Sequence, residues 1–169
     1  MPETIIAIDP SINFTGWCIS QNGKKIRSGV IKTEKYKTDA EKLSMIGFHL
    51  KEIISDNALQ PHNDLQPPIT VAIIEIPEAF TYRRSAGRYG KQLNVDSLFK
   101  LSRAVGVILY ICWKEEFKCI EVGATKWKGG MNKAVAMMVT GVKDNNEADA
   151  ILLSEYYFRM KKLEKFMGK

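Results

Sequence analysis

Three acidic residues stand where packing alone would not place them. Asp9 ends a short apolar segment, residues 4–9, directly before a Pro-Ser turn. Glu75 lies inside the most apolar segment of the chain, residues 71–76, and Asp149 lies where an apolar helix face begins. A carboxylate in such surroundings is unfavourable unless it is paired or binds a cation. Three of them, at the ends or centres of predicted core elements, indicate one shared metal site.

The ligand types indicate which metal this site would bind. Oxygen ligands without histidine or cysteine favour Mg²⁺ or Mn²⁺. Two such ions, about 3.5–4 Å apart, suit phosphodiester cleavage, because one activates the attacking water and the other stabilises the leaving 3′ oxygen. A zinc site is not expected, since the chain has no CxxC pair and His49 and His62 lie far apart. The pattern predicts metal-dependent hydrolysis of a phosphodiester and leaves the substrate open.

The hydrophobic pattern predicts the elements that would hold these carboxylates. Three short segments rich in β-branched residues are separated by tight turns and predict an antiparallel meander, at 4–9, 15–20 and 26–33. Further strands are predicted at 71–76 and 117–122, and helices at 38–57, 95–115, 132–140 and 146–165. The chain of 169 residues is expected to form one domain, residues 1–169.

Basic charge is gathered into three segments of a chain whose formal net charge is +6. These segments are 81–91, 123–133 and 159–169, and the remainder of the chain is net acidic. Such clustering favours a polyanion partner, although for any one segment alone a solvated face is the simpler interpretation. No stretch has the length of a membrane span, and an acid stands where a secretory signal would be basic, so we expect a cytoplasmic location.

Four segments together resemble motifs of the RuvC family of Holliday-junction resolvases, in its phage-type form. IAIDPSINFTGWCI resembles the first motif, in which a strand ends in Asp-Pro and turns through Thr-Gly into a second strand. VAIIEIPEAF resembles the second, in which a strand-borne Glu precedes a substrate-contacting loop. NVDSLFKLSRAVGVI is similar to the helix that follows, and NNEADAILLSEY resembles the terminal motif, where Ala-Asp-Ala opens the last helix.

The resemblance implies a fold and an activity. The fold would be ribonuclease-H-like: an α/β domain whose mixed five-stranded sheet has an antiparallel meander, then parallel strands, with helices on both faces. The activity would be that of a structure-selective endonuclease of DNA recombination and repair, which nicks Holliday junctions and forks by two-metal hydrolysis with Mg²⁺ or substituting Mn²⁺. A homodimer is expected, because resolution needs two symmetric nicks. A phage-encoded enzyme would work in the host-cell cytoplasm.

The resemblance also identifies site residues. Asp9, Glu75 and Asp149 match the metal ligands of the family, which has a fourth acid one helical turn before the last Asp. Here that position is Asn146. We favour coordination through the Asn146 carbonyl oxygen; two alternatives are that Glu147 reaches in, or that Asn146 is an engineered, inactivating substitution.

The predicted DNA contacts lie mostly in the loop that follows Glu75. In RuvC enzymes an aromatic residue of this loop contacts the junction centre, and here Phe80 or Tyr82 would stack on an unpaired base. Phosphate contact is the simplest role for the two lysines that match family lysines. The predicted DNA-binding residues are Phe80, Tyr82, Arg83, Arg84, Arg88, Lys91, Lys128 and Lys133.

Three other functions share some of these features. A sugar-kinase or actin-like ATPase also begins with a strand, an Asp and a Thr-Gly hairpin, but it needs a second lobe that 169 residues do not supply. A ribonuclease-H-like enzyme acting on RNA–DNA hybrids would use the same carboxylates. A junction-binding protein whose catalysis is impaired through Asn146 would keep the DNA contacts alone.

Overall fold

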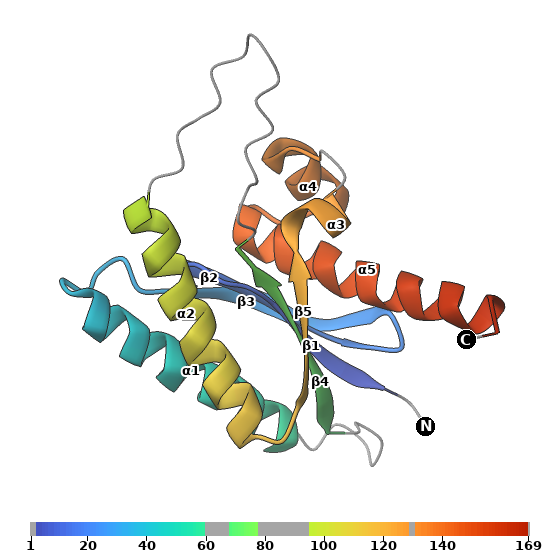
Figure 1. Ribbon diagram of the computed structural model, residues 1–169, viewed down its shortest axis with the longest axis horizontal. Helices are drawn as coiled ribbons and strands as arrows, with labels where there is room; N and C mark the ends of the chain where they lie inside the picture. Colours follow the sequence, from blue (N-terminus) through green and yellow to red (C-terminus); the bar gives the residue numbers. More distant parts are fainter. Residues whose placement is uncertain (1–2, 60–67, 78–94, 129–130, 169) are drawn as a thin grey trace, which may run out of the picture.

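The computed structural model describes residues 3–59, 68–77, 95–128 and 131–168. Its five strands form one sheet in the order β3-β2-β1-β4-β5. They are β1 (Thr4–Asp9), β2 (Phe14–Gln21), β3 (Lys24–Lys32), β4 (Ile69–Ile76) and β5 (Lys118–Gly123). The first three pair antiparallel, whereas β4 runs parallel to β1 and β5 runs parallel to β4. This confirms the predicted mixed sheet (Figure 1).

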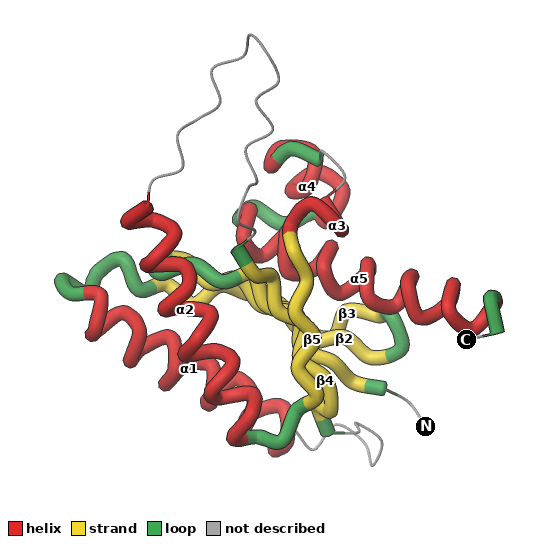
Figure 2. The backbone as a smooth tube through the Cα atoms, viewed as in Figure 1, coloured by secondary structure: helices red, strands yellow, loops and turns green. Residues whose placement is uncertain are grey.

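Helices cover both faces of the sheet, as expected (Figures 1 and 2). On one face lie α1 (Asp39–Leu59) and α2 (Val95–Lys114), and on the other lies α5 (Asn145–Phe166). Near the start of α5 are α4 (Lys133–Thr140) and a helix that the sequence did not predict, α3 (Ala124–Lys128). At five residues, α3 is too short to show a hydrophobic period.

Alternation along the central strands assigns each side chain to one of these layers. Ile6 and Ile8 of β1 join the core formed with α1 and α2, whereas Ile5 and Ala7 pack in the core formed with α5. Because side chains alternate along a strand, position 9 shares the α5 face with positions 5 and 7. The same alternation places Glu75 on the α5 face of β4, together with Val71 and Ile73. These core strands thus present two carboxylates to one face.

Local signals in the sequence account for the ends of several elements. Thr38 and Glu41 form the predicted capping box before α1, in which Glu41 N donates to Thr38 Oγ1 (3.2 Å) and Thr38 N donates to Glu41 Oε2 (2.9 Å). The β2–β3 hairpin turns at Asn22 and Gly23, whose φ angles of 50° and 84° suit a tight hairpin turn. None of the helices in the described ranges is both long and apolar enough to cross a membrane.

Candidate metal centre

The carboxyl ends of β1 and β4 bring Asp9 and Glu75 to the same place. The two strands are parallel, and Ile8 pairs with Ile74, so Asp9 and Glu75 occupy the next position of each strand. Both face α5, as the alternation requires. Asp9 is 7% exposed and Glu75 is partly buried. The fold therefore brings two of the three carboxylates predicted for the metal site to the same edge of the core.

The start of α5 adds the third predicted carboxylate. The Asp144 side chain caps the helix by accepting hydrogen bonds from the backbone N–H groups of Asn146 (2.8 Å) and Glu147 (3.3 Å). One turn further along, Asp149 is buried, with 4% of its surface exposed. Figure 1 shows this end of α5 beside the carboxyl end of β4. The helix cap and the strand ends thus gather three acids from distant parts of the sequence.

Gly16 allows the first turn of α5 to lie against the sheet. Gly16 of β2 pairs with Asp9 of β1. A Cβ atom at position 16 would lie only 1.9 Å from the backbone carbonyl oxygen of Asn146. No side chain fits in that space, so the glycine is what permits the helix to approach the strand next to Asp9.

Electrostatic interactions join the three acids into one cluster. Burial raises the pKa of Asp9 well above its usual range; the negative charges of Glu75 and Asp149 raise it further, and the charge of Lys128 opposes them. Burial also raises the pKa of Glu75, against the attraction of Lys128. The fold therefore holds carboxylates where ionisation is unfavourable, which is typical of a functional site.

Lys128 lies within this cluster. Its Nζ atom is 2.7 Å from Asp149 Oδ2 and 3.5 Å from Glu75 Oε2. Trp127, which is buried in the core beside α5, anchors α3 and places the lysine there. The sequence indicated only a phosphate contact for Lys128, so this ion pair was missed. Lys133, at the start of α4, is exposed, and its charge also acts on Asp9.

Two solved structures share this arrangement of elements. "T. thermophilus RuvC in complex with Holliday junction substrate" superposes with a TM-score of 0.66 at 18% sequence identity, over 95% of this chain and 96% of that chain. "Thermus thermophilus RuvC structure" superposes with a TM-score of 0.60 at 14% identity, over 96% of each chain. This chain has a RuvC-like fold. No protein-family model and no curated protein matches the sequence.

The RuvC-like fold confirms the ribonuclease-H-like architecture that the sequence motifs implied. At these identities the likeness to RuvC is one of fold, and it extends over nearly the whole of both chains. The roles of individual residues therefore depend on the geometry of this chain. The phage-type assignment stays a prediction from the sequence.

The position predicted for a fourth metal ligand lies in the first turn of α5. Asn146 is partly buried there, and its Oδ1 accepts a hydrogen bond from Asn145 Nδ2 (3.0 Å). Glu147, the alternative ligand, instead accepts a hydrogen bond from Ser28 Oγ of β3 (2.7 Å). Each of the two candidate ligands thus accepts one hydrogen bond, and Asn146 as the fourth ligand stays a prediction from the sequence.

The donor atoms of the cluster are of the type that a hard divalent cation binds. All candidate donors are oxygens, as Mg²⁺ and Mn²⁺ prefer. Glu75 Oε2 is buried, and apart from the Lys128 ammonium 3.5 Å away it has no polar partner in the part of the chain that the structure describes, which leaves it able to bind a metal. Yet within residues 3–59, 68–77, 95–128 and 131–168, no three Asp, Glu, His or Cys side chains stand close enough to hold a metal as placed. The acidic side chains would have to move closer together to bind a metal ion.

The predicted contacts of the loop after Glu75 are not tested by the geometry. Phe80, Tyr82, Arg83, Arg84, Arg88 and Lys91 all lie outside the described residues. Their DNA-binding roles stay predictions from the sequence. Of the predicted DNA-binding residues, Lys128 and Lys133 are described, and both lie close enough for their charges to act on Asp9.

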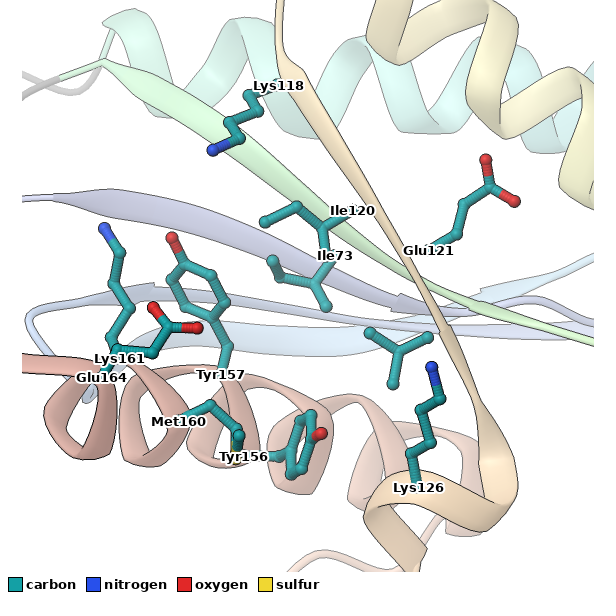
Figure 3. Close-up of a pocket in the computed structure, with 11 residues that line it drawn as sticks. Ile73, Lys118, Ile120, Glu121, Lys126, Tyr156, Tyr157, Met160, Lys161 and Glu164 are labelled. Carbon is teal, nitrogen blue, oxygen red and sulfur yellow. The ribbon is translucent and has the colours of Figure 1, made fainter. Parts of the chain in front are cut away.

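A separate pocket of about 330 Å³ lies between β5, α3 and α5 (Figure 3). Its lining includes Ile73, Ile120 and Tyr156, and none of the predicted site residues. Lys126 of α3 also lines this pocket, whereas Lys128 contacts the carboxylates of the metal centre. The two lysines of this short helix thus belong to different surfaces.

Proposed function

We propose that the protein is an endonuclease that nicks branched DNA, above all Holliday junctions, by metal-dependent hydrolysis. The observation that carries this proposal is the convergence of Asp9, Glu75 and Asp149 on a RuvC-like fold. One of the similar structures is RuvC in complex with a Holliday junction substrate, which supports branched DNA as the substrate. Forks are proposed as further substrates, and the cytoplasm as the location.

In the proposed reaction, Asp9, Glu75, Asp149 and Asn146 would hold two Mg²⁺ ions, for which Mn²⁺ can substitute. When bound, such ions supply an activated water and charge stabilisation of the leaving 3′ oxygen. Attack on phosphorus forms one P–O bond and breaks the bond to the 3′ oxygen, so the products are a 5′ phosphate and a 3′ hydroxyl. The buried carboxylates fix the donors, and the exposed Lys133 would attract the phosphodiester.

A nicking assay on the protein as given tests this function. We expect Mg²⁺ or Mn²⁺ to support nicking of a labelled four-way junction, with much slower cleavage of a duplex of the same sequence and none after chelation. Preferred cleavage of an RNA–DNA hybrid would favour the ribonuclease alternative. An inactive parent beside an active Asn146→Asp variant would favour the junction-binding protein with impaired catalysis.

We also propose that the enzyme is a homodimer, with an apolar stripe of α2 as the interface. Phe99 and Trp113 are more than half exposed, as are Val95 and Tyr110, and their spacing puts all four on one side of the helix. They form two exposed apolar pairs, Val95 with Phe99 and Tyr110 with Trp113, and grouped exposed apolar residues mark interfaces more often than single ones do. The stripe thus offers a self-complementary contact for a second copy.

Trp113→Glu is expected to weaken the dimer. A buried aromatic hot spot contributes about 2 kcal/mol or more, and a two-fold interface loses it from both copies, so the dissociation constant should rise by roughly 1,000-fold. Sedimentation velocity over a concentration series measures this change. Phe166→Glu, at an exposed aromatic of α5, is the matched control and should leave the dimer intact. A parent that sediments as a monomer at every concentration would contradict the proposal.

A further inference from the structure

The ammonium of Lys128 lies where a cation shared by two of the carboxylates would bind. It is 2.7 Å from Asp149 Oδ2 and 3.5 Å from Glu75 Oε2, and it stands 4.9 Å from the centre of the Trp127 ring. The lysine is therefore a positively charged group that the two carboxylates hold in place.

Stability alone does not account for this arrangement. A buried ion pair is often no more stabilising than apolar residues of the same shape, because both charges lose water. Here one ammonium faces three carboxylates, and among the residues described Glu75 Oε2 has no hydrogen bond, only the 3.5 Å ion pair with that same ammonium. The site remains short of positive charge after Lys128 has been counted.

We propose that Lys128 is a built-in competitor for the divalent cation of this site. The inference rests on the proposed function, because it takes the carboxylates to be metal ligands. A metal ion bonded to Glu75 Oε2 and Asp149 Oδ2, the two oxygens that Lys128 contacts, would take the place of the ammonium, so metal binding at these oxygens displaces Lys128. With Lys128 in contact with two of the carboxylates, no three acids of the described ranges stand close enough together to hold a metal.

Displacement gives Lys128 a second role at the same site. Its side chain is 30% exposed, so the released ammonium has a path to solvent and to a bound phosphodiester. The phosphate contact expected from the sequence and the ion pair in the structure are then two positions of one side chain. A DNA phosphate that binds the Lys128 ammonium would favour metal binding. Metal binding would favour DNA binding by the same factor, as thermodynamic linkage requires.

Titration of Mn²⁺ into the protein without DNA, followed by calorimetry, tests the competition. Lys128→Met keeps the length and apolar stem but removes the charge. We expect it to bind Mn²⁺ about tenfold more tightly than the parent, because no charge-assisted hydrogen bond has to break. Lys126→Met, on the same helix but lining the other pocket, is the matched control and should bind Mn²⁺ as the parent does. Lys128→Gln serves as a second variant should Lys128→Met not fold.

The outcomes separate this inference from the proposed function. Tighter Mn²⁺ binding by the Lys128 variants, with no change for Lys126→Met, supports the competition. Equal or weaker binding by the Lys128 variants overturns it and leaves the proposed function standing when the parent nicks junctions in Mg²⁺. Absence of Mn²⁺ binding by parent and variants alike, with and without junction DNA, overturns both.

Discussion

Asp9→Asn is expected to lower the rate of junction nicking by about 1,000-fold or more while leaving junction binding largely intact. Loss of a metal ligand removes several kcal/mol of transition-state stabilisation, and about 4 kcal/mol corresponds to that change in rate. The basic residues that contact phosphate are unchanged, and a less acidic site repels DNA less. Single-turnover cleavage and a binding isotherm in the absence of divalent ions measure the two effects.

The same substitution is expected to raise the melting temperature in the absence of divalent ions. Because folding raises the pKa of Asp9, the folded protein binds this proton more tightly than the unfolded chain does. Stability from this group is present at low pH and is lost as the pH rises from the unfolded pKa of about 3.9 towards the folded value. Asn has no such proton to lose. The melting-temperature gap between variant and parent should therefore widen as the pH rises through this window.

Asp56→Asn provides the matched control for this prediction. Asp56 is an exposed residue of α1, remote from the cluster, and its replacement should change neither nicking nor the melting temperature. If Asp9→Asn nicks junctions at the parent rate in Mg²⁺, Asp9 is not a metal ligand. If it is also less stable than the parent at neutral pH, the buried charge is satisfied by partners other than a metal.

The sheet and the three carboxylates could be predicted because their signals are local. Alternating burial and turn residues mark the strands, and a charged residue inside an apolar run is visible without any structure. Asp9 and Glu75 end strands whose parallel pairing makes their carboxyl ends meet. The resemblance to RuvC motifs added the mixed five-stranded sheet with helices on both faces. The fold was therefore predictable before any contact was known.

The remainder of the site depends on contacts between distant residues. Lys128 contacts Asp149 from a five-residue helix. A helix this short has no periodic sequence pattern, so neither the helix nor the direction of the lysine side chain could be predicted. Glu147 resembles a candidate ligand in the sequence, yet it bonds to Ser28, which lies 119 residues away in the chain. Gly16 resembles any turn glycine in the sequence. A glycine is required at position 16 because the folded chain places the backbone of Asn146 beside it.

Gly16→Ala is expected to destabilise the protein and to separate the two halves of the site. The new Cβ would stand 1.9 Å from the carbonyl oxygen of Asn146, and a clash with backbone cannot be relieved by turning a side chain. Overpacking of this kind costs about 3 kcal/mol, or roughly 6–12 °C in melting temperature for a chain of this size. The first turn of α5 must move away from β2, and it takes Asp149 away from Asp9.

Nicking should fall further than stability explains. A displacement of about 1 Å between reacting groups lowers rates by about 100-fold, so Gly16→Ala should be slow even at temperatures where it is fully folded. Gly47→Ala is the matched control, since Gly47 is also buried but its new Cβ would meet side-chain methyls and no backbone: Ile111 Cδ1 at 3.2 Å and Val107 Cγ1 at 3.5 Å. The gain in helix propensity of about 0.5–1 kcal/mol offsets that contact, and nicking should be unchanged. A Gly16→Ala protein that melts and nicks like the parent would mean that the approach of α5 to β2 does not set the distance between the two carboxylates.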